Sequence, residues 1–550
     1  MKLASLLLSV VLLTSTYAAV VVLEDGLEIH TLQSESRDYN DDYDDEDDHG
    51  NKTFDITLFH VNDVHAHLDH FRSSGTNCTD PTLGCYGGYA SIKATIDYLR
   101  PQKENSLFLN IGDEFQGTLY FSYYGGEKIA ETINQLGFDA FVLGNHEFDR
   151  GDDHLAQFLK NLTFPTVCAN IQSNNTDLME HIQPFRVFEE YDLAVIGVTT
   201  ETTPGISSPG PGTKFLNSTE TMQETIDFIR KEKLAKRIVA MTHIGYEEDK
   251  KLAQNTKGLY LIIGGHSHTP LGNFTGAQGP YPTIEKNLDG EEVFVVTAYR
   301  WGEYLGALDV SFDKKGRIVK YTGAPIHMIN TTAVDAKLEA QIREWAIPFI
   351  EYSRQVVGKT NVLLDQSICQ QGECNIGDAV SDAVLWYRGT NTDAAITNSG
   401  GYRASIDAGD ITLEQVLTTM PFGNAVVDLT FTGGDLWKSF EGIASKVSQF
   451  NGRIVTSFVQ VSKNIKFKYN PAAAVGSRLI ELSINGKPLS ASDTTTYKIS
   501  TWDFLANGGD NFWPKQTGFV TLDTQDDVFV AYLKQSGPLA GQLDGRISTV

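Results

Sequence analysis

The sequence of 550 residues is 41% hydrophobic and 21% charged, with 44 basic against 70 acidic side chains. This length and composition are typical of a folded protein with roughly two to four domains, and they exclude wholesale disorder. Five cysteines are too few for a small disulfide-rich scaffold. The formal net charge of −26 disfavours general binding to nucleic acids or anionic membrane surfaces, because like charges repel.

The chain begins with a segment typical of a signal peptide, residues 1–19. Lys2 supplies positive charge, an apolar run extends through Leu13, and small residues stand at Ala18 and Ala19. The apolar run is too short to span a bilayer. The C-terminal residues do not form the hydrophobic tail that signals a lipid anchor, so we do not expect one. We therefore expect a secreted, extracellular and soluble protein without a membrane anchor. An uncleaved N-terminal anchor is the alternative.

Residues 20–52 form a polar, acidic segment. Within residues 35–48, nine acidic side chains stand against the single Arg37. Because like charges at this density resist compaction, we expect a disordered arm or a pro-segment here.

Cysteines and glycosylation sequons agree with an oxidising, extracellular compartment. Two local cysteine pairs could each close a small disulfide loop: Cys78 with Cys85, and Cys369 with Cys374. Cys168 is left over, and we expect it to be a buried free thiol. Seven sequons for N-glycosylation begin at Asn51, Asn77, Asn161, Asn174, Asn217, Asn273 and Asn330.

Residues 53–330 alternate between apolar runs typical of strands and amphipathic stretches typical of helices. The expected helices include residues 89–99, 127–136 and 221–234. This alternation indicates an α/β domain, in which ligands bind at the carboxyl ends of the strands. The expected strands span residues 54–61, 107–111, 140–143, 194–198, 238–241 and 259–263.

A long helix is expected to join this domain to a second one. Residues 331–355 contain no glycine and one proline, Pro348, and we interpret them as a linker helix. From residue 356 to residue 550 a second mixed α/β pattern follows. Its glycine-rich turns lie at residues 398–401, 420–423 and 507–510.

Residues able to bind a metal ion follow the expected strands directly. Asp63 and His65 stand at i and i+2 of an extended segment, so their side chains point the same way. Oxygen donors mixed with imidazoles, without a thiolate, suit Zn, Mn or Fe. The candidate ligands are Asp63, His65, Asp113, Asn145, His243, His266 and His268.

This set is larger than one tetrahedral ion needs, whereas two ions that share a carboxylate would use it fully. Paired ions serve phosphoester hydrolysis, because they activate water and neutralise the charge that develops on phosphorus. A single histidine after a strand is more often structural, but the ordered set of D-x-H, G-D, G-N-H-x-x-D, H and G-H-x-H is specific. We do not expect the neighbouring His60, His67 and His70 to be ligands.

These motifs resemble those of the calcineurin-like metallophosphoesterases, and the chain from Thr53 onward resembles the two-domain 5'-nucleotidase family. The resemblance implies an α/β fold with a four-layer metallophosphoesterase β-sandwich flanked by helices, followed by a nucleotide-binding domain. It also implies two divalent ions, Zn or Mn. One ion would be held by Asp63, His65, Asp113 and His268, and the other by Asp113, Asn145, His243 and His266.

The resemblance assigns His146 and Asp149 as a catalytic dyad, and the chemistry of the motif supports this independently. Asp149 can orient the imidazole of His146 and stabilise its positive charge. His146 can then donate a hydrogen bond to phosphoryl oxygens as negative charge builds on them.

In the second domain the resemblance implies a nucleotide site. Phe422 and Phe504 match two aromatic residues that enclose the base, where flat rings gain buried area and stacking. Asp510 matches an acidic residue that binds the ribose hydroxyls. Asn398 and Arg403 match residues that reach the phosphate and the base.

The sequence departs from the family at a few positions. Many relatives carry a phosphate-binding arginine in the segment between Cys369 and Cys374, where this chain has Gln370 and Gly372. Glutamine lacks the charge and the bidentate fork of arginine, so phosphate affinity falls unless Arg403 compensates. His268 stands where many relatives carry Asn or Gln, which bears on metal preference.

We therefore predict a secreted, dinuclear-metal 5'-nucleotidase, a phosphoric monoester hydrolase that acts on nucleoside 5'-monophosphates. One alternative is an apyrase or UDP-sugar hydrolase acting on nucleotide di- or triphosphates or nucleotide sugars. Another is a non-catalytic nucleotide-binding protein with the same fold. Base preference, metal identity and oligomeric state stay open.

Overall fold

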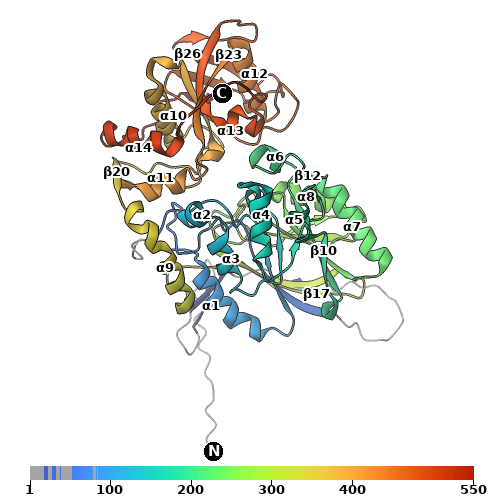
Figure 1. The fold of residues 1–550 in the computed structure, drawn as a ribbon. Helices are drawn as coiled ribbons and strands as arrows, with labels where there is room; N and C mark the ends of the chain where they lie inside the picture. Colours follow the sequence, from blue (N-terminus) through green and yellow to red (C-terminus); the bar gives the residue numbers. More distant parts are fainter. Residues whose placement is uncertain (1–17, 23–27, 33–36, 39–52, 79–81, 83) are drawn as a thin grey trace, which may run out of the picture.

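The computed structural model describes residues 18–22, 28–32, 37–38, 53–78, 82 and 84–550. The chain forms two lobes, and the long helix α9 (Ala336–Ser353) runs from one to the other (Figure 1). Both lobes mix sheets with helices, which confirms the expected α/β class.

Two β-sheets pack face to face in the N-terminal lobe. Successive side chains of a strand point to opposite faces, so neighbours enter different cores. Leu58 packs between the sheets, whereas Phe59 packs against the helices outside the first sheet. Val195 and Ile196 of the second sheet divide in the same way. The lobe therefore has four layers, helix–sheet–sheet–helix, as expected.

The strands that precede the predicted ligands run parallel in the centre of these sheets. The first sheet follows the order β1 (Ala18–Val22), β2 (Glu28–Leu32), β19 (Ile326–His327), β17 (Tyr304–Phe312), β4 (Phe54–Val61), β5 (Ser106–Asn110), β6 (Ala140–Val142), β7 (Thr166–Val167), β9 (Ile182–Gln183), with β18 (Ile318–Gly323) and β3 (Arg37–Asp38) to the side. The second follows the order β10 (Phe185–Phe188), β11 (Leu193–Thr199), β13 (Arg237–His243), β14 (Leu261–Gly264), β16 (Glu292–Val296), β15 (Thr283–Lys286), and a separate pair is β8 (Ile171–Gln172) with β12 (Lys214–Phe215).

Helices cover the outer faces of both sheets (Figure 1). The helices of this lobe are α1 (Tyr89–Leu99), α2 (Leu119–Tyr124), α3 (Glu127–Ile133), α4 (Gly151–Lys160), α5 (Thr176–Met179), α6 (Thr203–Ile206), α7 (Ser218–Glu232) and α8 (Tyr246–Gln254), with 3₁₀ turns η2 (Arg100–Gln102), η3 (His146–Phe148) and η4 (Glu189–Tyr191).

Three short strands, β1, β2 and β3, lie within or next to residues 20–52. β1 contains three consecutive valines and pairs antiparallel with β2, which pairs in turn with β19 through Thr31 and Ile326. β-branched residues favour strands, and here they continue an existing sheet edge. The other residues of that segment lie outside the described residues. So does the predicted signal peptide, apart from Ala18 and Ala19 in β1.

Helix α9 is anchored to the N-terminal lobe. Its N-cap is Asp335, whose carboxylate accepts a hydrogen bond from the backbone N–H of Leu338 at 2.8 Å. Its apolar face, including Leu338 and Ile342, joins the core outside the first sheet. Pro348 lies inside the helix without ending it. This face holds the linker against the lobe that carries the predicted metal ligands.

The C-terminal lobe has one continuous core, in which Trp502 is fully buried. Its sheets follow the orders β24 (Val459–Val461), β21 (Ala394–Asn398), β28 (Thr496–Trp502), β23 (Ala425–Thr432), β29 (Thr521–Thr524); β27 (Lys487–Pro488), β26 (Leu479–Ile484), β25 (Ile465–Tyr469), β30 (Ile547–Thr549); and β20 (Val356–Thr360) with β22 (Gly409–Thr412). Its helices are α10 (Asn375–Arg388), α11 (Leu413–Thr419), α12 (Gly433–Ser445), α13 (Asp503–Ala506) and α14 (Gln525–Ser536), with η5 (Gly389–Asn391), η6 (Ser399–Gly401) and η7 (Gly509–Asn511).

Both expected disulfides are present, and the remaining cysteine is free. Cys78 bonds to Cys85, and Cys369 bonds to Cys374. Cys168 is buried, and burial raises the pKa of its thiol to about 11. The structure therefore confirms the expected buried free thiol.

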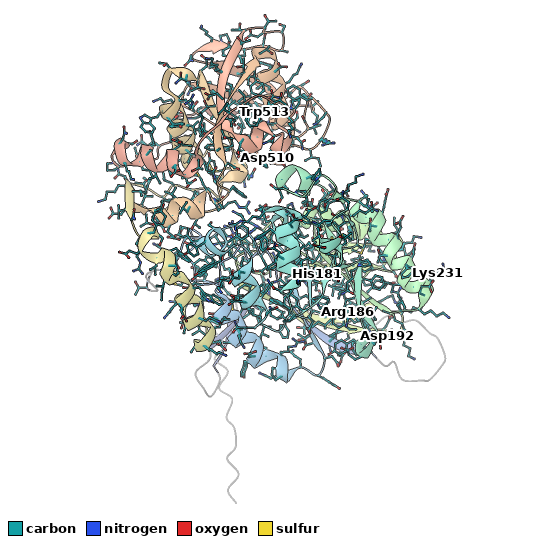
Figure 2. All side chains as sticks on the ribbon, viewed as in Figure 1. His181, Arg186, Asp192, Lys231, Asp510 and Trp513 are labelled. Carbon is teal, nitrogen blue, oxygen red and sulfur yellow. A yellow bond between two sulfur atoms is a disulfide. The ribbon has the colours of Figure 1, made fainter. Side chains whose placement is uncertain are left out.

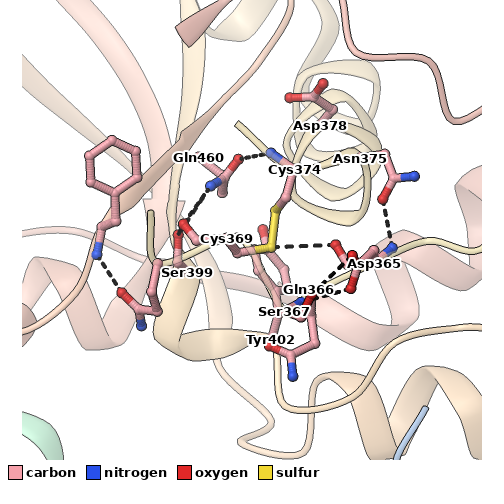
Figure 3. Close-up of a disulfide and its surroundings, with 12 residues drawn as sticks. Asp365, Gln366, Ser367, Cys369, Cys374, Asn375, Asp378, Ser399, Tyr402 and Gln460 are labelled. Carbon is pink, nitrogen blue, oxygen red and sulfur yellow. Dashed lines mark hydrogen bonds between the residues drawn. A yellow bond between two sulfur atoms is a disulfide. The ribbon is translucent and has the colours of Figure 1, made fainter. Parts of the chain in front are cut away.

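The disulfide of the C-terminal lobe is tied to the neighbouring sheet by Gln460 (Figure 3). The side-chain oxygen of Gln460 accepts a hydrogen bond from the backbone N–H of Cys374 at 3.2 Å. Its amide nitrogen donates to Oγ of Ser399 at 3.1 Å, just beyond the end of β21. The loop closed by the disulfide therefore lies beside the glycine-rich turn that follows β21.

No helix in the described part of the chain combines the length and apolarity that a bilayer span requires.

The surface of the described residues fits the expectations for glycosylation. The described asparagines of the sequons are all exposed: Asn77, Asn161, Asn174, Asn217, Asn273 and Asn330.

Candidate active site

The predicted metal ligands lie at the carboxyl ends of strands from both sheets. Because parallel strands end at the same edge of a sheet, the residues that follow them gather there. Many of these residues have left-handed backbone conformations, with φ between 48° and 80°. Such conformations cost energy outside glycine and persist mainly at functional sites. The left-handed ones are Asp63, His65, Asp113, His266 and His268.

The ligand atoms form two clusters that meet at Asp113. Within each cluster the ligand atoms lie within 4.8 Å of one another; the clusters are Asp63 with His65 and His268, and Asp113 with His243 and His266. Oδ2 of Asp113 is 3.9 Å from Nε2 of His65 and 3.0 Å from Nε2 of His243. Asp113 is therefore placed where two ions could share its carboxylate.

Backbone carbonyls orient two of the imidazoles toward the clusters. Nδ1 of His65 lies 3.0 Å from the carbonyl oxygen of Phe115, and Nδ1 of His243 lies 2.6 Å from that of Ile111. A carbonyl oxygen only accepts hydrogen bonds, so each Nδ1 carries a proton. The Nε2 atoms are thereby directed to the clusters, an arrangement typical of metal-binding histidines.

The electrostatics of the clusters favour cations. Burial raises the pKa of Asp113, but the imidazoles of His243 and His146 outweigh this and hold it well below its usual value. Burial lowers the pKa of His243, yet Asp113 and Asp63 raise it to about 10. Burial lowers the pKa of His266 to about 3, which keeps this imidazole neutral. The site thus combines ionised carboxylates with the neutral imidazole of His266 and the imidazole of His243, whose proton these carboxylates retain.

Asn145 provides an independent test of whether these residues fit metal ions. Its side-chain Oδ1 is buried and has no hydrogen-bond partner among the described residues. A buried acceptor without a partner is costly, and a bound cation would satisfy it. Carboxylates, imidazoles and an amide oxygen together suit Zn or Mn. The residues present therefore fit a pair of divalent ions.

His146 and Asp149 form the hydrogen-bonded pair expected of the dyad. Across η3, Nδ1 of His146 lies 2.8 Å from Oδ2 of Asp149, and Oγ of Ser207 donates to the other carboxylate oxygen at 2.7 Å. Burial lowers the pKa of His146, but Asp149 and Asp113 raise it above its usual value. The imidazole of His146, 5.3 Å from that of His65, is therefore favoured as a hydrogen-bond donor.

Glu147 is a residue of this site that sequence reasoning missed. Its carboxylate accepts hydrogen bonds from the backbone N–H groups of Asp113, Glu114 and Gly144 at 2.9, 2.7 and 2.6 Å. Burial raises its pKa to about 7. Glu147 thereby ties the loop after β5 to the loop after β6 and positions Asp113. The available signal was an acidic residue between the two members of the dyad.

The C-terminal lobe contributes side chains to the same site. Nη2 of Arg403 donates a hydrogen bond to Nε2 of His65 at 3.3 Å, although the two are 338 residues apart. The ring of Phe422 lies 5.8 Å from the ring of His146 and 6.0 Å from the guanidinium carbon of Arg403. Two of the predicted substrate residues therefore meet the dyad and the metal clusters directly.

The other predicted substrate residues lie together within the C-terminal lobe. Oδ2 of Asp510 accepts a hydrogen bond from Asn398 at 2.7 Å, and its Oδ1 accepts one from Thr456 at 2.6 Å. Burial raises the pKa of Asp510 to about 6. The ring of Phe504 packs on Gly509, where a Cβ would lie 2.5 Å from it. Figure 2 shows Asp510 on the side of this lobe that faces the N-terminal lobe.

Gln370, at the position of the missing arginine, is engaged within its own lobe. Its side-chain oxygen accepts a hydrogen bond from the backbone N–H of Phe458 at 2.9 Å, and its nitrogen donates to Ser457 at 3.3 Å. Gly372 adds no side chain, and its carbonyl accepts from Gln460. Neither residue presents a charge to the site.

The histidines that were not expected to be ligands have other partners. His60 pairs with the hydroxyl of Tyr281 at 2.8 Å, and His70 with the hydroxyl of Ser91 at 2.9 Å. His67 lies within 3.0 Å of three backbone carbonyl oxygens. None of the three belongs to the candidate metal clusters found among the described residues.

Comparison with known families matches each lobe separately. Residues 56–270 match the calcineurin-like phosphoesterase family, and residues 356–516 match the 5'-nucleotidase C-terminal domain. Both matches agree with the resemblance drawn from the motifs.

Similar proteins span nearly the whole chain. A snake venom 5'-nucleotidase of Naja atra is 33% identical over 90% of this chain and 98% of its own. A 5'-nucleotidase of Homo sapiens is 32% identical over 90% of this chain and 91% of its own. The crystal structure of a 5'-nucleotidase precursor from Thermus thermophilus superposes with a TM-score of 0.83 at 34% identity, covering 90% and 99% of the two chains.

Proposed function

Because this chain belongs to the 5'-nucleotidase family and is a phosphoric monoester hydrolase, we propose that it hydrolyses nucleoside 5'-monophosphates to a nucleoside and phosphate. One observation carries the proposal furthest. Arg403 and Phe422, from the nucleotide lobe, contact His65 and His146, from the metal lobe. A nucleotide held by the first pair would present its phosphate to the second.

We propose that the reaction uses two divalent ions, Zn or Mn. One would be held by Asp63, His65, Asp113 and His268, and the other by Asp113, Asn145, His243 and His266. When bound, the ions would supply Lewis acidity toward the phosphoryl group and an activated water. The convergence of the ligand atoms on Asp113 and the unpaired oxygen of Asn145 support this assignment.

The dyad supplies a hydrogen-bond donor beside the phosphate. Asp149 accepts the Nδ1 proton of His146 and favours the protonated imidazole. The opposite nitrogen, Nε2, is then an N–H donor available to a phosphoryl oxygen. Such a donor stabilises the transition state because negative charge on these oxygens increases during the reaction. Ser207 holds the carboxylate in place from its other oxygen.

The nucleoside would be bound by the C-terminal lobe. The rings of Phe422 and Phe504 would enclose the base, since flat aromatic surfaces gain buried area and stacking there. Asp510 would hold the ribose, and Asn398 and Arg403 would reach the phosphate and the base.

We also propose that the protein is secreted. The sequence of residues 1–19 is typical of a signal peptide. The two disulfides are typical of an oxidising compartment. The exposed sequon asparagines are accessible to glycosylation enzymes.

Phosphate release by the purified protein tests the activity. AMP, ADP, ATP and UDP-glucose would be offered in parallel, with chelator and with Zn or Mn added back. We expect metal-dependent turnover with AMP preferred. Preference for ADP or ATP would indicate an apyrase instead, and no metal-dependent turnover on any of the four would contradict the proposal.

A variant separates catalysis from binding. His146→Ala should lose turnover while the protein still binds adenosine, because His146 acts on the phosphate. His70→Ala is the matched control, since its imidazole bonds to Ser91 away from the clusters. A His146→Ala protein as active as this control would favour a non-catalytic interpretation of the dyad.

A further inference from the structure

Arg300 lies in a constrained loop beside a predicted metal ligand. Its two neighbours, Tyr299 and Trp301, have left-handed backbone conformations, with φ of 68° and 59°. The carbonyl oxygen of Tyr299 accepts a hydrogen bond from Asn62 at 2.6 Å, and the N–H of Trp301 donates to the carbonyl of Asp63 at 2.8 Å. The loop is therefore held against the end of β4, and Arg300 is presented at a defined position.

Trp301 fixes the side chain of Arg300 by stacking. The guanidinium carbon lies 3.7 Å from the centre of the Trp301 ring system. The indole also packs against His67, whose ring is 4.7 Å away and inclined by 24°, and against Phe71, whose ring is 5.3 Å away. Gly75 leaves room for the indole, since a Cβ there would lie 2.5 Å from it. Arginine on an aromatic face retains its hydrogen-bonding edge for a ligand.

The guanidinium of Arg300 has no acidic partner among the described residues. Its Nε is buried and makes no hydrogen bond. A buried donor without an acceptor is costly, so its retention calls for an acceptor supplied by a ligand.

The loop that carries Arg300 lies beside both a predicted metal ligand and the segment that carries Arg403. Besides the bond from Trp301 to Asp63, a Cβ at Gly75 would lie 2.5 Å from the Trp301 indole and 3.2 Å from Cβ of Ala404, the residue that follows Arg403. This loop of the N-terminal lobe therefore lies where the two lobes meet at the candidate active site. Positive charges held near each other favour an anion between them.

We propose that Arg300 is a second phosphate-recognising residue, which acts with Arg403 to bind the phosphoryl oxygens of the substrate. The inference rests on the proposed nucleotidase function. It also accounts for Gln370, whose amide is engaged by Phe458 and Ser457 and offers no charge. Phosphate recognition is thereby shared between Arg403 of the nucleotide lobe and Arg300 of the lobe that holds the metal ligands.

The test compares Arg300→Ala with Arg317→Ala in the metal-loaded full chain. Arg317 is a matched control because it pairs with Asp313 and Glu291 on the surface. Calorimetry would measure the Kd for inorganic phosphate, and kinetics the KM and kcat for AMP and the inhibition constant of adenosine. A hydrogen bond to a charged group predicts an increase of about 10- to 100-fold in the phosphate Kd and in KM. Adenosine, which lacks phosphate, should bind as in the wild type.

Two outcomes would overturn the proposal. One is a phosphate Kd for Arg300→Ala equal to that for Arg317→Ala. The other is an equal loss of phosphate and adenosine binding, which would indicate a structural role. Arg300→Gln, which retains part of the side chain but not its charge, repeats the measurement if the alanine variant does not fold. Phosphate calorimetry does not require turnover, so failure of the nucleotidase proposal would be seen separately, as a wild type inactive on AMP.

Discussion

Replacing Asp149 by alanine tests the dyad at its defining contact. The change removes the acceptor of the 2.8 Å bond from Nδ1 of His146, in a pair whose side chains are only 8% and 12% exposed. A hydrogen bond to a charged group contributes about 1.5–3 kcal/mol, and about 1.4 kcal/mol corresponds to tenfold in rate. We therefore expect kcat for AMP to fall by about 10- to 150-fold. KM should change less, because Asp149 acts through His146.

Two further variants make the Asp149→Ala result specific. Ser207→Ala removes the donor to the other carboxylate oxygen but leaves the bond to His146, so its effect should be smaller. Asp153→Ala removes an exposed acidic side chain of α4 and should behave as wild type. The assay is phosphate release at saturating AMP with added Zn or Mn, and circular dichroism verifies folding. A folded Asp149→Ala protein with the kcat of Asp153→Ala would refute the role of the dyad.

Metal binding, pH and stacking each offer another test. Zn or Mn added to chelator-treated protein should raise the midpoint of thermal unfolding, because ions that bind only the folded state stabilise it. Asp113→Asn should abolish most of this rise. An unchanged rise would contradict the proposal that both ions share the carboxylate of Asp113. The raised pKa of Asp510, about 6, means that its carboxylate is ionised above that pH and protonated below it. Adenosine binding should therefore weaken as pH falls through about 6, a step that Asp510→Asn should lose; a pH-independent wild type would contradict this. Phe422→Ala should raise KM for AMP by about tenfold, an effect of the size expected for a lost aromatic contact. KM for p-nitrophenyl phosphate, which lacks a base, should stay unchanged. Equal increases in KM for both substrates would contradict stacking of the base on Phe422.

Much of the candidate site could be predicted because its residues obey a local rule. Asp63 and Asp113 each follow a buried parallel strand, and such strands end at one edge of a sheet. A short pattern was therefore enough to place distant residues together. The dyad was equally local, since His146 and Asp149 are separated by a single 3₁₀ turn. The alternation of apolar runs and helical stretches predicted the α/β class for the same reason.

Other parts of the site have no local signal. Glu147 accepts hydrogen bonds from four backbone N–H groups, and such contacts cannot be recognised from the identities of the residues that make them. The stacking of Arg300 on Trp301 depends on a loop whose conformation is set by hydrogen bonds to β4 and the residues that follow it. The pairing of β1 and β2 with the edge of the first sheet likewise has no signal in the charge pattern of this segment.

By itself, then, the sequence determined the two-lobed α/β class, the set of candidate ligands, the candidate dyad and the family. Each of these can be recognised from a local pattern, either the periodicity of a strand or a short spacing between residues. Only the tertiary structure decided how the lobes meet. Arg403 reaches His65 across 338 residues, and Phe422 reaches His146, because α9 and the packing of two separate cores bring the lobes together. Such contacts depend on the relative placement of whole lobes, which no local pattern encodes.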